Sequence, residues 1–470
     1  MEDSTTDAVT SRAQRNAGRW AAEEESTLRY RLRHQNFCLV VLLFVSILTV
    51  TSACGAIVYA VVEHFWTSLE DVDQTTRSAD SGSSPAGGSS LVFGSPAAEV
   101  VMQRLPDAKD TSGGVVFCFV NYSVSSGSPH RFYVDNATAA LCDALVFVSV
   151  ALLPAVSGLA FRRPTRDAEA LQVLVSLAGS SSAAWACVGG ESSDSGDFEW
   201  LMAERKSRAA FVHNAAAWSR RVGVAGLLLY WKYPPRQSRS VYNTFVNTMR
   251  NAFERDSLRL SVVVPWATTA RLDGYDVRSL YRHLDFVVVD THRTVDPRTF
   301  PVTTCQTPMR AAFRARHQGQ AGLSSVLDDL SMDSEHFLDK TVLSVSLSAV
   351  TFTLRRPWVR RARPGMSAAG PGRPFGRTNQ PGLASYYDVA WALSQNASWR
   401  RERHAFSRCS LVRLEDQWLG VEDRGSLRSK KSAVRRTAGL AVWDLPMDDF
   451  AGELGTAWPL LRAAHEVVHG

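Results

Sequence analysis

Eight short apolar runs, separated by connections long enough to hold a helix, constrain the fold of this chain more than any other feature. The runs carry few charges and are rich in Val, Leu and Phe, as strands are when both faces of a parallel sheet are buried. They span 114–120, 144–153, 171–179, 222–230, 258–266, 284–290, 341–350 and 438–445. Eight such strands predict an α/β fold, the (β/α)8 TIM barrel, in which functional side chains lie at the carboxyl ends of the strands.

The composition is that of a globular protein. Of 470 residues, 45% are hydrophobic and 21% are charged, which allows a sizeable core. The formal net charge of +6 is mild, and the sequence has no zinc-finger spacing and no regular pattern of basic and aromatic residues. We therefore expect no nucleic-acid partner, no metal site and no cofactor.

Residues 37–62 form an uncharged segment that is long enough to cross a bilayer as a helix. Arg29, Arg31 and Arg33 precede it, and acidic residues follow it. The positive-inside rule then predicts a type II signal anchor with residues 1–36 in the cytoplasm and the barrel outside the cell or in a lumen. The alternative is a cleaved signal peptide, which the long leader with as many acids as bases disfavours.

The segment after this span has the composition of a linker. Residues 63–112 are rich in Ser, Gly, Ala and Pro, which predicts a flexible stalk before a barrel domain over 113–470. Sequons at Asn121, Asn136 and Asn396 are candidate glycosylation sites in a secretory compartment.

The cysteine count agrees with an extracellular domain. Cys38 and Cys54 belong to the apolar span, and five more follow it, namely Cys118, Cys142, Cys187, Cys305 and Cys409. Because this number is odd, at least one thiol is unpaired or bonded to another chain, and a disulfide-linked oligomer is one alternative.

At the strand ends the chain resembles the glycoside hydrolase family 18 chitinases and chitinase-like proteins over 113–470. The matching segments, in order, are "VFCFVNYS" for the first strand, "VLVSLAG" for the SxGG third strand, "GLLLYWKYP" for the DGxDxDWExP fourth strand, "KTVLSVSLSAVTFTL" for the seventh strand, "PFGRTNQPGLASYYDV" and "EDQWLGVED" for the insertion, and "AGLAVWDLPMDDFAG" for the eighth strand. The resemblance implies a small α+β insertion between strands 7 and 8, at about 355–425. It also implies a disulfide between Cys118 and Cys142. The pairing of Cys187, Cys305 and Cys409 stays open, with three possible single bonds and one thiol left over.

The family's catalytic motif is degenerate in this chain. The resemblance implies substrate-assisted cleavage of β-1,4-linked N-acetylglucosamine, for which the motif supplies one acid and the carboxylates that hold the acetamide. Ala225, Leu228, Tyr230 and Lys232 occupy the positions of those acids. Because a general acid needs a transferable proton and a suitable pKa, the sequence predicts a pseudoenzyme.

Lys232 replaces the catalytic glutamate, and two interpretations of it stay open. The lysine either drifted after catalysis was lost and now reaches water or pairs with Asp290 or Asp444, or it grips an anionic ligand. The family's seventh-strand Y-G-R is 348–350 here, and "VVVDTH" stands for its M-x-Y-D, so that Asp290 is a candidate retained acid.

Two aromatic residues match family positions that face bound sugar. Trp443 corresponds to the tryptophan under the sugar, and Tyr122 to an aromatic at the mouth of the first strand, so we predict that both bind glycan. The alternative for Trp443 is a structural role, in which it fills the top of the barrel. Alternation along the strand predicts that Trp231 points outward into the helix layer. We expect His292 to be a solvated loop residue. The arginines of 355–377 form either a solvated loop or a site for sulfated glycans or phospholipid headgroups.

Three functions follow from this pattern. The first is a membrane-anchored, catalytically inactive chitinase-like protein that binds chitin or N-acetylglucosamine-containing glycans in the barrel cleft. The second is an interaction scaffold with a vestigial cleft and a protein partner. The third, an active hydrolase with relocated acids, is disfavoured because no other predicted strand end offers a carboxylate pair. A glycan on Asn121 would crowd the mouth of the cleft.

Overall fold

The computed structural model describes residues 114–122, 132–179, 182–266, 272–292, 295–359, 361 and 363–470. Eight parallel strands pair in one closed ring, because β1 pairs with both β15 and β2. In ring order the strands are β1 (Val115–Asn121), β2 (Ala144–Leu153), β4 (Ala183–Gly189), β5 (Gly226–Tyr230), β6 (Arg259–Pro265), β7 (Val287–Asp290), β8 (Thr341–Ser346) and β15 (Gly439–Trp443). The predicted (β/α)8 barrel is therefore confirmed.

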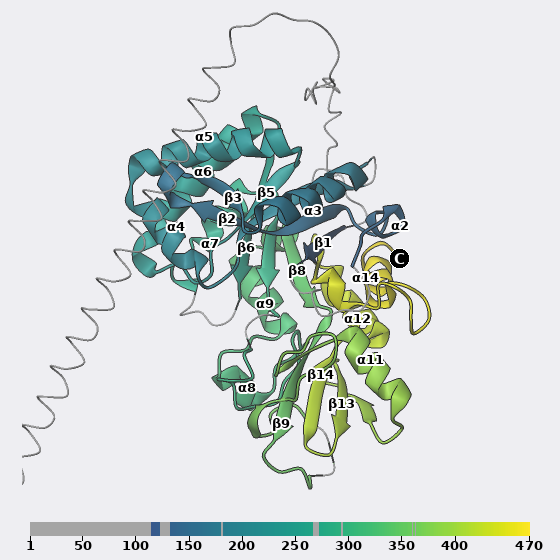
Figure 1. Cartoon of the computed structure of the whole chain (residues 1–470). Coiled ribbons are helices and arrows are strands. Elements are labelled where there is room, and N and C mark those ends of the chain that lie inside the picture. Colours follow the sequence, from purple (N-terminus) through teal and green to yellow (C-terminus); the bar gives the residue numbers. More distant parts are fainter. Residues whose placement is uncertain are drawn as a thin grey trace, which may run out of the picture. The chain divides into compact units, whose positions relative to one another are not determined.

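Helices surround the barrel (Figure 1) and bury their apolar faces against the outer side of the strands. They are α2 (Asn136–Ala139), α3 (Pro164–Leu177), α4 (Asp194–Ala203), α5 (Arg205–Val222), α6 (Arg239–Arg255), α7 (Val277–His283), α9 (Leu323–Asp333), α10 (Glu335–Leu338), α12 (Arg424–Ser429), α13 (Lys431–Val434) and α14 (Pro459–His469). One extra strand, β3 (Gly158–Phe161), pairs antiparallel with β2.

The strands alternate between two cores, as the pleat requires. On β5, Leu228 and Tyr230 belong to the cluster inside the barrel. Leu227 and Leu229 belong to the outer cluster between strands and helices, and so does Trp231, which directly follows the strand. Trp231 stacks on Phe198 of α4 with ring centroids 5.3 Å apart. The prediction that Trp231 points outward into the helix layer is therefore confirmed.

The predicted third strand, 171–179, is wrong. Residues Pro164–Leu177 form helix α3, with proline in the first turn, buried Leu171 and Leu174 on one face, and Val173 exposed on the other. The third barrel strand is β4, "AAWACVG", which is followed by Gly190. A short apolar run of this length does not by itself distinguish a buried strand from a helix.

The seventh apolar run splits into two strands. Its first part is barrel strand β8, and its second part opens β9 (Ser348–Leu354), which belongs to a separate antiparallel sheet beside the barrel (Figure 1). The other strands of that sheet are β10 (Ala368–Pro371), β11 (Leu383–Ser385), β12 (Arg400–Arg403), β13 (Ser410–Leu414) and β14 (Gln417–Val421). With α11 (Tyr386–Gln395), this sheet makes an α+β insertion between the seventh and eighth barrel strands, and helix α8 (Phe313–His317) lies next to it (Figure 1).

The predicted cytoplasmic segment, membrane span and stalk all lie outside the described residues. Within the part of the chain that the structure describes, no helix has the length and apolar character needed to cross a membrane. The anchor over 37–62 therefore stays a prediction.

The structure contains the disulfide between Cys118 and Cys142 that the resemblance implied. It joins β1 to the turn that precedes β2. Cys187, Cys305 and Cys409 are buried and form no disulfide with one another in this structure. Because these thiols are covered, the described residues offer no free cysteine on the surface for a bond to another chain.

Asp448 gives the fold a pH dependence. Burial raises the pKa of this carboxyl to about 7, although it accepts backbone N–H bonds from Leu461, Asp449 and Leu460 near the start of α14. Because the folded-state pKa lies above the unfolded value near 4, the native state keeps a proton that the unfolded chain loses. This contribution to stability is complete below pH about 4 and is lost as the pH rises through about 7.

We expect Asp448→Asn to flatten the pH dependence of the unfolding free energy between pH 5 and 7. As the pH rises through this range, the unfolding free energy of the wild type should fall by up to about 1.4 kcal/mol per pH unit relative to that of the variant. Denaturant titrations of both proteins at several pH values measure this difference. Parallel curves for the two proteins would show that Asp448 does not titrate there.

Candidate functional site

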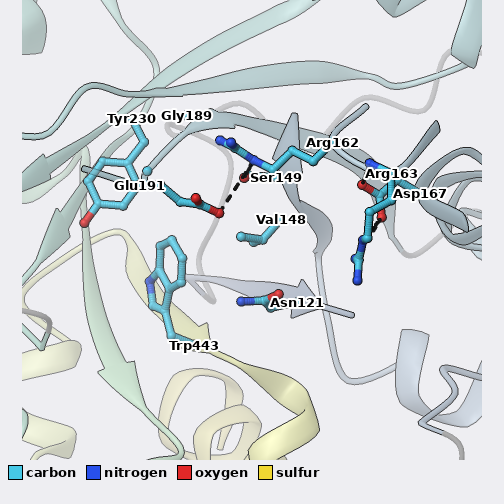
Figure 2. A pocket seen from close by; sticks show the side chains of 11 residues that line it. Asn121, Val148, Ser149, Arg162, Arg163, Asp167, Gly189, Glu191, Tyr230 and Trp443 are labelled. Atoms are coloured by element: carbon cyan, nitrogen blue, oxygen red, sulfur yellow. Dashed lines mark hydrogen bonds and ion pairs between the residues drawn. The ribbon is translucent and has the colours of Figure 1, made fainter. Parts of the chain in front are cut away.

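A cavity of about 200 Å3 lies at the carboxyl ends of the barrel strands (Figure 2). Barrel strands β1, β2, β4, β5 and β15 contribute lining residues at their carboxyl ends, where a (β/α)8 barrel places its functional groups, and the connection from β3 into α3 contributes the rest. The lining residues are Asn121, Val148, Ser149, Arg162, Arg163, Asp167, Gly189, Gly190, Glu191, Tyr230 and Trp443. The cavity is smaller than the roughly 300–1,000 Å3 of typical ligand pockets, so it suits one small group such as a single sugar ring.

The degenerate motif lies on β5 and just beyond it. Leu228 and Tyr230 point into the barrel and are almost fully buried. Lys232 follows the strand, its Nζ lies 5.3 Å from the centroid of the Tyr230 ring, and its carbonyl oxygen accepts a hydrogen bond from Ser195 Oγ (3.1 Å). No carboxylate is present at any of these positions, so this strand supplies neither the acid nor the acetamide-holding groups.

Tyr230 spans the top of the barrel. Its ring lies against Gly190, because a Cβ at that glycine would come within 2.7 Å of the Tyr230 ring. Gly190 has φ +99°, a conformation that L side chains rarely adopt. At the other end, the Tyr230 hydroxyl donates a hydrogen bond to the Asp290 carboxylate. Tyr230 therefore occupies space that a shorter aspartate would leave open.

Asp290 is part of a buried polar network with His292 and Ser344. The backbone N–H of His292 donates to Asp290 Oδ1 (3.1 Å), and His292 Nδ1 lies 2.9 Å from both Asp290 Oδ1 and Ser344 Oγ. A Ser-His-Asp relay uses both ring nitrogens, one for each partner. Here the serine and the aspartate share one nitrogen, so this network is not a nucleophilic triad.

The expectation that His292 is a solvated loop residue is wrong, since only 2% of its surface is exposed. The residue directly follows Thr291 at the carboxyl end of β7, and its ring centroid lies 5.2 Å from that of Trp443. Its place two residues beyond a barrel strand was the signal in the sequence that should have placed it in the site.

Trp443 lies between the barrel core and the cavity. Its ring stacks on Phe119 with centroids 3.7 Å apart and an interplanar angle of 16°. Tyr230 lies 6.0 Å away on another side. The residue lines the cavity although its exposed fraction rounds to 0%. Phe119 therefore closes one face of the indole, and a ligand can reach the ring only from the cavity.

Tyr122 does not line this cavity, so the structure does not bring it together with Trp443, and its role in glycan binding stays a prediction. Along β1, Phe119 points into the barrel and Val120 points outward. Alternation then places Asn121 on the cavity and Tyr122 in the outer layer, where it packs edge-on against Phe132 with centroids 5.4 Å apart. Burial raises the pKa of the Tyr122 hydroxyl to about 12.

A charged wall that the sequence analysis missed completes the cavity. Arg162, which directly follows β3, binds both carboxylate oxygens of Asp194, at 2.7 and 2.8 Å, and also donates to Ser149 Oγ (3.0 Å). Glu191 lies 3.7 Å from the same arginine (Figure 2). Because the arginines and acids on this wall pair with each other, the cavity has little net charge and is suited to a neutral polar ligand.

Arg163 and Asp167 form the second ion pair of the wall, at 2.8 Å. Arg162 and Arg163 lie in the connection after the second barrel strand, where the sequence pattern alone gives no indication of a site. The pair of Arg163 with Asp167 is local, four residues apart at the start of α3, whereas the pair of Arg162 with Asp194 of α4 spans 32 residues and depends on the tertiary fold.

The three candidate glycosylation sites lie in different places. Asn121 lines the cavity, whereas Asn136 at the start of α2 and Asn396 at the end of α11 are exposed. Among the described residues, no group of three or more His, Cys, Asp or Glu side chains could hold a metal ion.

Comparisons with known proteins agree with this architecture. The family model "Glycosyl hydrolases family 18" matches residues 115–448. The chain is 23% identical to Manduca sexta endochitinase over 380 residues, which cover 76% of this chain and 68% of that protein. It is 26% identical to Drosophila melanogaster probable chitinase 10 over 303 residues, which cover 60% of this chain but only 13% of that protein.

Solved structures show the same fold. The Group IV chitinase of Ostrinia furnacalis superposes with a TM-score of 0.69 at 22% identity, covering 75% of this chain and 98% of the other. Human YKL-39, described as a pseudo-chitinase with retained chitooligosaccharide binding, superposes with a TM-score of 0.68 at 19% identity, covering 76% and 100%. The neighbours in fold therefore include both chitinases and a pseudo-chitinase.

Proposed function

Because the chain belongs to family 18 of the glycosyl hydrolases, we propose that it is a chitinase-like protein that binds glycans without cleaving them. Its ligands are chitin-type oligosaccharides or other N-acetylglucosamine-containing glycans, and the binding site is the cavity at the top of the barrel. One observation carries this proposal: the cavity keeps an aromatic wall, Trp443, whereas the motif positions hold Leu228, Tyr230 and Lys232 in place of acids.

The chemistry of the motif supports inactivity. Cleavage of a glycosidic bond needs a proton donor at the leaving oxygen. Protonated Lys232 would place a positive charge where the reaction develops a cation, and neutral lysine is far too weak an acid. Asp290 does not replace the missing acid, because it is 1% exposed and bonded to Tyr230 and His292.

The lining of the cavity supports binding of a neutral sugar. The apolar C–H face of a pyranose packs against an aromatic ring, and Trp443 offers its ring on the cavity side. Asn121, Ser149 and Glu191 supply polar atoms near it for hydroxyl or amide groups. YKL-39 retains chitooligosaccharide binding as a pseudo-chitinase, which shows that binding and cleavage are separable on this fold.

We expect the purified full chain to be retained on chitin beads and not on cellulose beads. The two polymers share their β-1,4 linkage, but only chitin carries the acetamide group. Soluble N-acetylglucosamine oligomers should elute the protein, and glucose oligomers should not. Equal recovery from both matrices, or none from either, would support the alternative of an interaction scaffold with a vestigial cleft.

We further propose that residues 37–62 anchor the protein as a type II membrane protein with the barrel outside the cytoplasm. The uncharged segment and the arginines before it support this orientation. With one epitope tag at each end, protease added to intact cells should remove the C-terminal tag and spare the N-terminal one. Protection of the C-terminal tag would refute the orientation, and full release into the medium would favour a cleaved signal peptide.

A further inference from the structure

Two of the free cysteines lie together in the core of the insertion. Cys305, between β7 and α8, and Cys409, just before β13, belong to one apolar cluster and are 1% and 0% exposed. Both sulfurs contact Ser407: Cys305 Sγ is 3.9 Å from its Oγ, and Cys409 Sγ is 3.4 Å from its carbonyl oxygen. Cys409 is also close enough to Cys305 to help raise the pKa of its thiol. Cys187, in contrast, lies in the barrel interior.

The backbone holds these two segments in contact independently of the sulfurs. A Cβ on Gly420 of β14 would come within 2.8 Å of Cys305 Cα, so the segment with Cys305 crosses directly over this glycine. Gly420 pairs with Leu411 on β13, two residues after Cys409. The sheet therefore fixes both cysteines on one side of the same strand pair.

We propose that Cys305 and Cys409 form a second disulfide when the chain folds in an oxidising compartment. This inference rests on the proposed placement of the barrel outside the cytoplasm. The two sulfurs, which both contact Ser407, come together to a bonded distance of about 2.05 Å. Cys187 takes no part in either of these two bonds.

The oxidation is a thiol–disulfide exchange. One thiol loses its proton and attacks a disulfide donor, such as glutathione disulfide or a disulfide oxidoreductase, and releases one donor thiolate. The second cysteine, as thiolate, attacks the resulting mixed disulfide and releases the other donor thiolate. One S–S bond forms in the protein, and the donor takes up the two electrons and the two protons.

Burial determines when this exchange takes place. Burial raises the pKa of the Cys305 thiol well above its usual value, and the neighbouring Cys409 raises it further. A covered thiol with a raised pKa reacts slowly, so the bond must form during folding, before the insertion closes over the pair. The bond would hold the segment that follows Asp290 and His292 against the insertion sheet.

Disulfide mapping of the full chain from the surface of animal cells tests the proposal. Free thiols are alkylated with N-ethylmaleimide during denaturation without reductant, and the digested peptides are weighed. We expect Cys118 linked to Cys142, Cys305 linked to Cys409, and Cys187 alkylated. Alkylation of both Cys305 and Cys409 beside an intact Cys118–Cys142 bond would overturn the proposal.

The Cys118–Cys142 bond distinguishes absence of the second disulfide from an error in the proposed placement of the barrel outside the cytoplasm. If that bond is also reduced in cells, the placement outside the cytoplasm is wrong. The full chain is then refolded with a mixture of reduced and oxidised glutathione, and disulfide mapping of the refolded protein tests the bond between Cys305 and Cys409. There too, an intact first bond with Cys305 and Cys409 both alkylated would overturn the proposal.

Single substitutions give a second readout. Cys305→Ser should lower the melting temperature of the oxidised protein by several degrees. The matched control Cys187→Ser should show the same drop in melting temperature on addition of reductant as the wild type. Added reductant should lower the melting temperature of the wild type more than that of Cys305→Ser, because the wild type then loses two bonds and the variant only one. Equal losses would contradict a second disulfide.

Discussion

Chitooligosaccharides incubated with the purified protein are expected to stay intact. Enzymes of this kind accelerate hydrolysis at least about 10⁶-fold over the uncatalysed reaction, and a positioned general acid alone contributes roughly 10²–10⁴-fold. Leu228, Tyr230 and Lys232 supply no acid and no carboxylate for the acetamide. Mass spectrometry of the products should give the same rate of chitooligosaccharide cleavage with this protein as with buffer alone, while an active chitinase run in parallel cleaves the substrate.

Restoring the glutamate alone should not restore cleavage. Lys232→Glu returns one carboxyl group, but the Tyr230 side chain still fills the space beside Gly190 and binds Asp290. We therefore expect Lys232→Glu to release no product above background. Cleavage products formed by the wild-type protein would contradict inactivity. If the variants Asp290→Asn and Asp444→Asn still formed those products, neither aspartate would be the substitute acid.

Replacing Lys430 is expected to cost about 3–5 kcal/mol of unfolding free energy, because it leaves a buried carboxylate unpaired. Lys430 and Glu422 are each 2% exposed and form a hydrogen-bonded ion pair, and Thr307 Oγ1 donates to the same Glu422 oxygen (2.7 Å). Burial is the largest single cause and lowers the pKa of Lys430, but Glu422 together with Cys409 and Cys305 raises the pKa overall, so the lysine stays charged. This pair joins β14, α12 and the segment after β7.

Lys430→Met tests this cost by denaturant titration. The matched control is Arg428→Met, whose partner Glu466 is 54% exposed and whose loss should cost less than about 1 kcal/mol. The double variant Lys430→Met with Glu422→Met should recover most of the stability, since it removes both buried charges. A loss for Lys430→Met no larger than that of Arg428→Met would show that the pair does not hold the insertion to the barrel.

The barrel could be predicted from the sequence because its strands are buried on both faces and therefore appear as apolar runs. The third strand escaped because "AAWACVG" is rich in alanine, while the neighbouring helix α3 carries the longer apolar run. The split between β8 and β9 was missed for a related reason, since the apolar run continues through Leu347 from one sheet into another.

The site was predictable where strand alternation applies and unpredictable where distant segments meet. Alternation placed Trp231 correctly, and the same rule applied to β1 would have rejected Tyr122 and selected Asn121. The hydrogen bond from Tyr230 to Asp290 joins residues 60 positions apart. No periodicity encodes that distance, so the contact of Tyr230 with Asp290 across the top of the barrel could be found only from the structure.

Calorimetric titration of the full chain with N-acetylglucosamine oligomers tests the central claim most directly. We expect saturable binding that Trp443→Leu abolishes and that Trp391→Ala leaves unchanged, because Trp391 is an exposed tryptophan on the insertion that does not line the cavity. Thermal unfolding of each variant verifies that it is folded. Absence of heat from a folded wild-type protein, or binding that survives in folded Trp443→Leu, would contradict glycan recognition by the barrel cavity.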